Sequence, residues 1–368
     1  MKRSRREFLK TLSVTSIALG AGPIYLRSAT PIKKKVLVLG GTKFVGPAVV
    51  NAALKRDHNV TLFNRGITNP GLLPELPLIK GDREKGIGAY EPLKSMNWDV
   101  VIDVWPEKAG LVDDATKALQ MNAKHYIFVS SIAVYRDFQE VGLNENSQVV
   151  EPRTNRSEWG YAEEKLSSER IVAKRFPKNH TVLRPGPIKG WRDSAKDLYY
   201  WLYRLKEDRQ ILGPGTGKDP LQFIDVNDVG RFAVKSFENK LNGIFNCTGP
   251  REKQLVWKEF LSIAKTHLGS DSKIYWPGEE FLKTHKVRSF EDLPLWAPLS
   301  EDRGFMQISM RKSVANGFEF TPVEKTIDET IRWVEKTAKS KVPSGGLTKS
   351  MESELIKKLE RSNVKKTN

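Results

Sequence analysis

A tyrosine and a lysine four residues apart, Tyr161 and Lys165, could together carry out acid–base chemistry. On a helix, positions i and i+4 share one face, so the lysine ammonium would lie beside the tyrosine phenol. A free tyrosine, with a pKa of about 10, is a poor base at neutral pH. A neighbouring cation favours the phenolate and brings its pKa towards the working range. The pair therefore predicts proton transfer to or from a hydroxyl or carbonyl group.

A glycine turn is a second candidate functional feature. It follows a short apolar run and opens a helical pattern. Such a turn lets backbone N–H groups approach a pyrophosphate at the positive end of the helix, and its last glycine permits close helix–strand packing. A tight turn without a ligand is the alternative. We expect the whole turn to bind a dinucleotide cofactor: Gly40, Gly41, Thr42, Lys43, Phe44, Val45 and Gly46.

The residues after the second expected strand bear on the choice between NAD and NADP. Dinucleotide sites usually have a carboxylate there for the ribose hydroxyls. In this chain Phe63 is followed by Asn64 and Arg65, with no carboxylate. Asn64 could hydrogen-bond a ribose, and Arg65 could meet a 2′-phosphate or stack on adenine. The pattern favours NADP slightly over NAD without deciding between them.

The candidate functional residues lie far apart in the sequence, so the fold must bring their segments together at one edge of a sheet. Short apolar runs typical of buried strands alternate with helical patterns, which predicts an α/β fold with a doubly wound parallel sheet, the NAD(P)-binding Rossmann fold. The expected strands are Val36–Leu39, Asn59–Phe63, Leu78–Lys80, Asp99–Val104, His125–Val129, His180–Arg184, Phe223–Val226 and Ile244–Asn246. The expected helices between them include Val45–Arg56, Gly110–Met121 and Tyr161–Phe176.

The remaining segments suggest a smaller C-terminal substrate lobe. We expect the Rossmann domain in residues 33–190 and 223–250, the lobe in 191–222 and 251–338, and a basic, partly disordered tail in 339–368 with a short helix near Ser350–Leu359. An aromatic segment of the lobe contains Tyr200 and Arg204. Aromatic faces suit sugar rings and arginine suits an anion, so both are candidate substrate residues, with an amphipathic packing helix as the alternative.

Five segments in order resemble the extended short-chain dehydrogenase/reductases, the family of NAD-dependent epimerases and dehydratases. They are Gly40–Gly46, Phe128–Tyr135, Tyr161–Lys165, Leu183–Ile188 and Phe223–Val229. The resemblance implies that Ser131 hydrogen-bonds the substrate oxygen, Tyr161 is the acid/base, and Lys165 tunes it and holds the cofactor ribose. It also places Asp82 at the adenine amino group and Pro185 beside the nicotinamide.

The chain departs from the family pattern at positions that narrow the chemistry. Lys43 stands at the middle glycine of the family's G-x-x-G-x-x-G, as in an atypical branch that reads G-G-T-[RK]-F-[IVL]-G. Ile132 and Ala133 follow Ser131 where sugar-nucleotide 4,6-dehydratases have an Asp–Glu pair, so we do not expect a dehydratase. The five histidines are scattered without ligand-like spacing, and we expect no metal.

The first thirty residues resemble a twin-arginine export signal. Arg5 and Arg6 precede Phe-Leu-Lys and a short apolar stretch that ends near Ala21. We expect the twin-arginine machinery to read residues 1–30 and the protein to be periplasmic or otherwise exported, with membrane anchoring if the signal is not cleaved. The only cysteine is Cys247, so no intrachain disulfide can form. This suits a protein that folds in the cytoplasm and is exported with its cofactor already bound.

The net charge of +17 is concentrated at the two ends of the chain. Residues 1–30 and 339–368 each carry +5, which leaves +7 for the body. Basic ends are weak evidence for nucleic-acid binding, and we expect no nucleic-acid partner.

The sequence thus predicts an exported NAD(P)-dependent oxidoreductase or epimerase acting on a hydroxyl or carbonyl group, with a sugar or nucleotide sugar as candidate substrate. Net and transient oxidation use the same residues, so the sequence does not separate them, nor does it decide between a monomer and a homodimer. Two alternatives stay open. One is a cofactor-binding protein that has lost catalysis. The other is an RNA-binding protein resembling the chloroplast stem-loop-binding proteins, which share the atypical glycine pattern.

Overall fold

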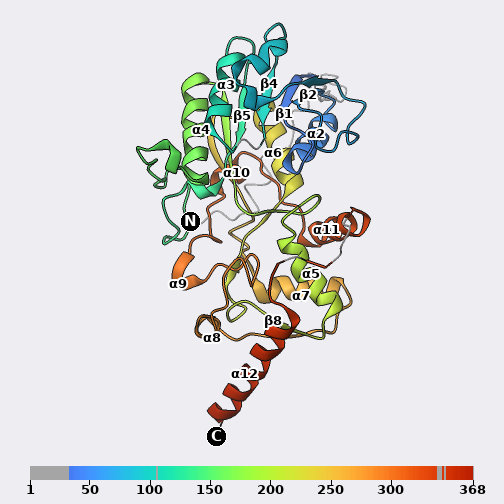
Figure 1. Cartoon of the computed structure of the whole chain (residues 1–368), viewed down its shortest axis with the longest axis vertical. Coiled ribbons are helices and arrows are strands. Elements are labelled where there is room, and N and C mark those ends of the chain that lie inside the picture. The colour runs from blue at the N-terminus through green and yellow to red at the C-terminus, as the bar shows by residue number, and fades with distance from the viewer. Residues whose placement is uncertain (1–32, 105–106, 338–341, 344, 368) are drawn as a thin grey trace, which may run out of the picture. The chain divides into compact units, whose positions relative to one another are not determined.

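The computed structural model describes residues 33–104, 107–337, 342–343 and 345–367, so the expected signal peptide lies outside the described residues. A seven-stranded parallel sheet with the order β11-β6-β5-β4-β1-β2-β3 forms the centre of residues 33–250 (Figure 1). Its strands are β1 (Lys35–Leu39), β2 (Asn59–Asn64), β3 (Leu78–Lys80), β4 (Val100–Asp103), β5 (Tyr126–Val129), β6 (His180–Pro185) and β11 (Gly243–Cys247). The strand order reverses between β1 and β4, which confirms the predicted doubly wound Rossmann fold.

Helices cover both faces of this sheet. On one face α2 (Val45–Leu54) packs against α6 (Val226–Glu238), and on the other α3 (Ala109–Leu119) packs against α4 (Tyr161–Arg175). Successive residues of β1 alternate between the two cores: Val36 and Val38 lie in one, Leu37 and Leu39 in the other. Burial on both faces explains why the strands read as nearly continuous apolar runs. In the described residues, 3₁₀ helices in the connections are η1 (Arg83–Lys85), η2 (Ile87–Leu93), η3 (Ile132–Val134) and η4 (Arg156–Glu158).

A separate apolar core, which includes Trp201, Trp257 and Trp296, marks the C-terminal lobe. Three two-stranded sheets flank it or join it to the Rossmann part: β7 (Ile188–Lys189) with β10 (Ile224–Asp225), β8 (Gln210–Leu212) with β13 (Lys273–Tyr275), and β9 (Pro220–Leu221) with β12 (Leu255–Val256). The helices of the C-terminal part are α5 (Asp197–Glu207), α7 (Trp257–His267), α8 (Glu279–Thr284), α9 (Leu299–Asp302), α10 (Arg311–Ala315), α11 (Val323–Thr337) and α12 (Lys349–Thr367).

Two expected boundaries differ in the structure. The strand expected at Phe223–Val226 is only β10, and it pairs with β7 outside the main sheet because Asp225 caps α6, which begins at Val226. Within the expected lobe, Met310 and Phe318 pack into the core shared by α2 and α6. The chain therefore returns to the Rossmann part before α11.

The tail was expected to be partly disordered with a short helix near Ser350–Leu359, and the structure has a longer helix there, α12 (Lys349–Thr367). Helix α12 buries Leu355, Ile356 and Leu359 against the lobe core, each less than a tenth exposed. The lysine-rich composition concealed three apolar residues at helical spacing, which are enough to dock one face of the helix.

In the described part of the chain, no helix is long and apolar enough to cross a membrane.

Candidate active site

The predicted functional residues gather at the carboxyl ends of the parallel strands. The glycine turn follows β1, Asn64 ends β2, and Ser131 follows β5 by two residues. Because these strands lie side by side in one sheet, residues far apart in sequence share this edge. In doubly wound sheets this edge, near the reversal of strand order, is where ligands bind.

The glycine turn has the geometry that phosphate binding needs. Gly40 and Gly41 have φ angles of 109° and 96°, which disfavour side chains. A Cβ on Gly46 would lie 2.5 Å from the Cα of Gly41, so only glycine lets α2 begin this close to the turn. Helix α2 has no side-chain cap at its N-terminus and no acidic residue in its first turn. Its positive end is therefore available to an anion.

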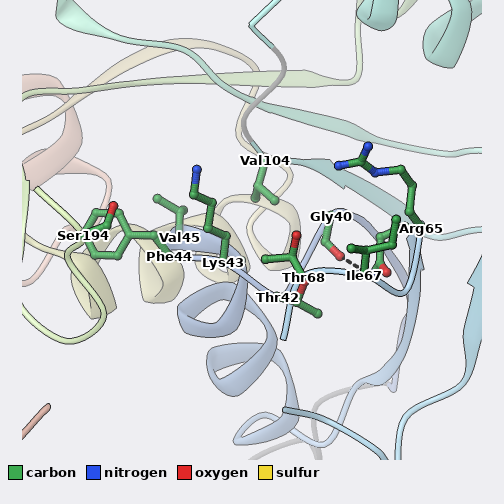
Figure 2. A pocket seen from close by; sticks show the side chains of 13 residues that line it. Gly40, Thr42, Lys43, Phe44, Val45, Arg65, Ile67, Thr68, Val104 and Ser194 are labelled. Atoms are coloured by element: carbon green, nitrogen blue, oxygen red, sulfur yellow. Dashed lines mark hydrogen bonds between the residues drawn. The ribbon is translucent and has the colours of Figure 1, made fainter. Parts of the chain in front are cut away.

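The turn opens onto a cavity of about 300 Å³, shown in Figure 2. This cavity brings together nine of the residues predicted to bind the cofactor. They are Gly40, Gly41, Thr42, Lys43, Phe44, Val45, Gly46, Asn64 and Arg65. Ile67, Thr68, Val104 and Ser194 complete its lining.

Asn64 shapes this cavity by holding two loops together. Its Nδ2 donates to the carbonyl of Gly40 at 2.7 Å, and its Oδ1 accepts from the backbone N–H of Gly66 at 2.7 Å. Both ends of the amide are thus engaged with backbone. Asn64 therefore has a scaffolding role in the turn, and its expected ribose contact remains a prediction.

Arg65 and Lys80 form a basic edge beside the cavity. Arg65 and Lys43 extend to the same side of the turn in Figure 2, and neither has a carboxylate partner among the described residues. Lys80 pairs in register with Asn64, and its Cε would lie 3.3 Å from a Cβ on Gly66. The sequence analysis missed Lys80. Its position at the end of the strand next to β2 was the available signal.

Asp82 lies outside this cavity's lining, at the start of η1. Its Oδ1 accepts from the backbone N–H of Glu84 at 3.2 Å, the bond of a turn residue. Pro185 is buried at the end of β6, in register with Cys247, and does not line the cavity either. The adenine and nicotinamide contacts expected from these two residues remain predictions.

A buried carboxylate that the sequence analysis missed ends β4. Asp103 is fully buried and accepts from Arg83 Nη1 at 2.6 Å and from the Tyr126 hydroxyl at 2.7 Å. Arg83 also donates to the Tyr90 hydroxyl at 2.8 Å. Asp103 is therefore neutralised by a paired guanidinium and fixes η1 against the sheet.

The predicted catalytic residues Ser131 and Tyr161 meet in the structure. Ser131, in extended backbone after β5, lies close enough to Tyr161 at the start of α4 for its hydroxyl to lower the pKa of the phenol in part. Tyr161 is 41% exposed, so a substrate can reach its ring. Both hydroxyl-bearing residues thus lie near the carboxyl end of β5.

Lys165 lies one turn further along α4 and is only 1% exposed. Its Nζ donates to the carbonyl of Val129 at 2.9 Å and lies 5.6 Å from the centre of the Tyr161 ring. Burial lowers the pKa of Lys165 to about 8, while the charges of Asp103 and Glu169 oppose this shift. The helix thus places both side chains on one face, as their spacing predicts.

The pKa of Tyr161 shifts in the direction opposite to the expectation. Burial raises it, the Ser131 hydroxyl lowers it in part, and the charge of Glu107 raises it again. Desolvation thus outweighs the lowering by Ser131, and the pKa of the phenol lies above its ordinary value. Glu107 was not among the predicted site residues.

A buried ion pair joins α4, which carries Tyr161 and Lys165, to the sheet. Glu169, two turns after Tyr161, accepts from Arg184 Nε at 2.9 Å and from Arg184 Nη2 at 2.7 Å. It also accepts from the Ser130 hydroxyl at 2.6 Å. This network joins α4 to the ends of β5 and β6, and so fixes Ser131 and Lys165 relative to each other.

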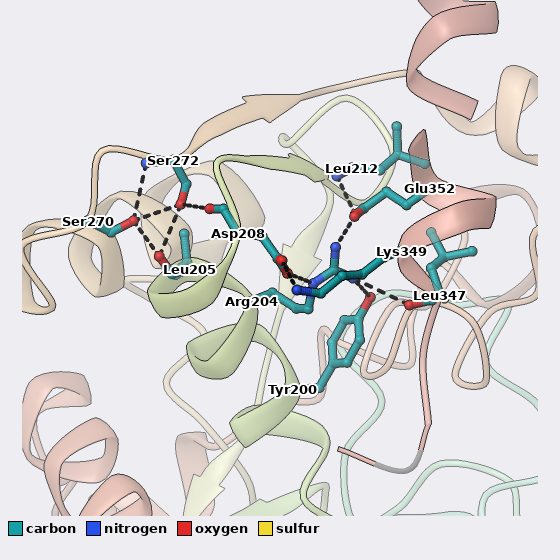
Figure 3. A network of polar contacts seen from close by, with 10 residues as sticks. All are labelled: Tyr200, Arg204, Leu205, Asp208, Leu212, Ser270, Ser272, Leu347, Lys349 and Glu352. Carbon is teal, nitrogen blue, oxygen red and sulfur yellow. Dashed lines mark hydrogen bonds and ion pairs between the residues drawn. The ribbon is translucent and has the colours of Figure 1, made fainter. Parts of the chain in front are cut away.

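The proposed substrate residues Tyr200 and Arg204 require a correction. Both are buried, at 3% and 4% exposure. Figure 3 shows that Arg204 contacts Asp208 and Glu352 and donates to the Tyr200 hydroxyl at 3.0 Å. Arg204 was expected to bind an anionic group of a substrate, but Asp208 and Glu352 already pair with it. Through Glu352, Arg204 anchors α12 to the lobe. The packing-helix alternative describes α5 correctly.

Within the described ranges, no group of three or more His, Cys, Asp or Glu side chains is arranged to hold a metal ion.

Comparison with known proteins agrees with this geometry. Residues 36–248 match the family model of the NAD dependent epimerase/dehydratase family. A curated relative, the chloroplast stem-loop binding protein of 41 kDa b from Arabidopsis thaliana, is 27% identical over 247 residues, which are 62% of each chain. The match thus spans about three fifths of that relative's length.

Solved structures share the fold at low sequence identity. One is a UDP-glucuronic acid 4-epimerase from Bacillus cereus in complex with NAD, which is 17% identical with a TM-score of 0.59 and covers 83% of this chain and 98% of its own. Another is a UDP-Glc/GlcNAc 4-epimerase from Campylobacter jejuni, which is 16% identical with a TM-score of 0.61 and covers 83% of this chain and 100% of its own.

Proposed function

Because the chain belongs to the NAD-dependent epimerase/dehydratase family, we propose that it is an NAD(P)-dependent epimerase or oxidoreductase that acts on a hydroxyl or carbonyl carbon of a sugar or nucleotide sugar. The observation that carries this proposal is the proximity of the Ser131 and Tyr161 hydroxyls, with Lys165 one turn further along the same helix and its Nζ 5.6 Å from the Tyr161 ring centroid. The sugar substrate is suggested by the fold neighbours, whose names are those of UDP-sugar epimerases.

In this mechanism Tyr161 transfers the proton of the substrate hydroxyl and Ser131 orients the oxygen. Lys165 holds the ribose of the cofactor and stabilises the phenolate when the proton leaves. The glycine turn and the N-terminus of α2 receive the pyrophosphate. The nicotinamide, when bound, supplies hydride transfer. We further propose NADP as the preferred cofactor, because Arg65 and Lys80 form a basic edge where NAD-binding chains have a carboxylate.

Two measurements on the purified full-length protein test this proposal. Denaturation followed by mass spectrometry of the released nucleotide should identify a nicotinamide dinucleotide, and NADP in excess over NAD. A panel of nucleotide sugars should then yield a stereoisomer without free reduced cofactor for an epimerase, or a ketone with stoichiometric reduced cofactor for a dehydrogenase. A protein that neither releases nor binds a dinucleotide would contradict the proposal.

A second candidate function is RNA binding, favoured by the curated relative that is named for stem-loop binding and by the basic ends of the chain. Phosphate contacts from lysine and arginine make such binding strongly salt-dependent. Tight binding of an RNA stem-loop at physiological salt, with no effect of a dinucleotide, would favour this candidate. Binding that disappears at physiological salt would indicate only non-specific attraction.

A further inference from the structure

The segment that follows β7 contacts the glycine turn, although the two are about 150 residues apart in the sequence. Arg192 Nε donates to the carbonyl of Lys43 at 2.9 Å. Two residues later, Ser194 lines the same cavity as the glycine turn (Figure 2). Ser194 therefore contributes to the lining of the candidate cofactor cavity from a segment, residues 191–222, that the sequence analysis assigned to the substrate lobe.

This segment is firmly held. Buried Lys189 contacts Asp193 at 3.3 Å and Asp197 at 2.7 Å. Asp193 is itself buried, accepts from the backbone N–H of Ala195 at 3.0 Å, and donates its own N–H to the carbonyl of Gly190 at 3.2 Å. The turn is thus determined by several bonds that do not involve Arg192.

The backbone at Arg192 has a φ angle of 67°, in the left-handed region that disfavours an arginine. Strained residues of this kind persist where the surroundings over-determine them, and they cluster at functional sites. Here the strain directs a long cationic side chain to the rim of the glycine turn.

Within the described part of the chain, the charge of Arg192 meets the Trp191 ring, whose centroid lies 5.5 Å from its Cζ, but no carboxylate. Burial lowers the pKa of Arg192 without an opposing contribution. The bond to Lys43 uses only Nε, whereas an arginine offers five donors. A structural link to one carbonyl would need neither a positive charge nor a second and third nitrogen.

We propose that Arg192 binds the cofactor's pyrophosphate from the side opposite α2 and slows its dissociation. This inference rests on the proposed dinucleotide function and deepens it. The helix N-terminus supplies only about half a positive charge, which leaves most of the pyrophosphate charge to be neutralised. A guanidinium can donate two parallel hydrogen bonds to a phosphate and is weakly hydrated, so it suits this partly buried rim.

The test uses the full-length protein and two substitutions that separate charge from contact. Arg192→Gln keeps a side-chain donor within reach of the Lys43 carbonyl but removes the charge, and Arg192→Ala removes both. We expect both to speed NADP dissociation about tenfold or more, measured by chase with unlabelled dinucleotide, as for a lost charge-assisted hydrogen bond. The exposed Arg209→Gln controls for the loss of one positive charge and should dissociate at the wild-type rate.

Other results would overturn the inference. Fast dissociation from Arg192→Ala with a wild-type rate for Arg192→Gln would make Arg192 a neutral link between two loops. Unchanged dissociation from both would remove it from the site. A substrate diphosphate is a second source of the same chemistry, so ADP and UDP serve as probes. Weaker UDP binding with unchanged ADP binding would assign the residue to the substrate. A wild-type protein that binds no dinucleotide would instead refute the proposed function itself.

Discussion

At the scale of single residues, the site contains groups placed at its open edge and groups that hold its loops together. Tyr161 and Ser131 meet at the open edge, whereas Asn64 spends both ends of its amide on backbone. Residue type did not distinguish these roles, because an exposed amide at a strand end can serve either. The hydrogen-bond partners of Asn64 in the structure revealed its scaffolding role.

The lowered pKa of Lys165 leads to a pH-dependent cofactor affinity. If its ammonium holds the ribose hydroxyls, dinucleotide binding needs the protonated form, which is lost as pH rises through about 8. We expect affinity to be constant below pH 7 and to fall above pH 8. Titration of NADP binding by tryptophan fluorescence across this range would show it. The Lys165→Met variant should bind more weakly at neutral pH and lack the fall, and an identical fall in that variant would remove Lys165 from the ribose.

Substitution of Gly46 tests whether the glycine turn holds the cofactor. Alanine adds only the Cβ, but that atom would lie 2.5 Å from the backbone of Gly41, so the turn or α2 must shift. We expect Gly46→Ala to lose retained nucleotide while residues 33–367 stay folded by circular dichroism. Gly88→Ala is the matched control, since nothing lies within 4 Å of its added Cβ. Normal nucleotide content in Gly46→Ala would show that the turn does not hold the cofactor.

At the scale of elements, the parallel sheet was predictable to within one or two residues at most strand ends. Continuous apolar runs such as Val36–Leu39 arise only where both faces are buried, and helical patterns separated them clearly. The lobe was less predictable. Its strands are two or three residues long, too short for periodicity to register, and α12 carries its apolar face within a lysine-rich segment.

The ion pair beneath α4 predicts a large loss of stability on substitution. Glu169→Gln leaves Arg184 buried without a charge partner, which typically costs about 3–5 kcal/mol. Urea unfolding at pH 7 would measure the loss. Lys206→Met breaks the exposed pair with Glu335 and should change stability by less than about 1 kcal/mol. Equal, small effects of the two substitutions would mean that Glu169 does not anchor the catalytic helix.

At the scale of the whole molecule, one chain combines a cofactor domain, a docked C-terminal helix and an N-terminal segment with a paired arginine motif. Arg204 and Glu352 tie α12 to the lobe, so residues 345–362 belong to the folded protein. The residues of the lobe that would face a substrate could not be predicted, because its aromatic residues fill the core and give no sequence signal for a ligand-facing surface.

We propose that the N-terminal segment exports the folded, cofactor-loaded protein. Arg5→Lys combined with Arg6→Lys should keep the protein in the cytoplasm, because the twin-arginine machinery reads this pair. Immunoblots of periplasmic and cytoplasmic fractions would measure the distribution. Arg3→Lys lies outside the pair and should be exported normally. An unchanged periplasmic yield from the double variant would contradict the proposal.

The most direct test of the central claim is turnover by Tyr161→Phe on a nucleotide sugar identified in the substrate panel. Phenylalanine keeps the ring and deletes only the hydroxyl that moves the proton, so the variant should stay folded and retain its dinucleotide. General acid–base steps are worth roughly 100- to 10,000-fold, and a rate loss of that order or larger is expected. Tyr203→Phe on α5 should turn over at the wild-type rate. A Tyr161→Phe protein that also turns over at the wild-type rate would contradict the account.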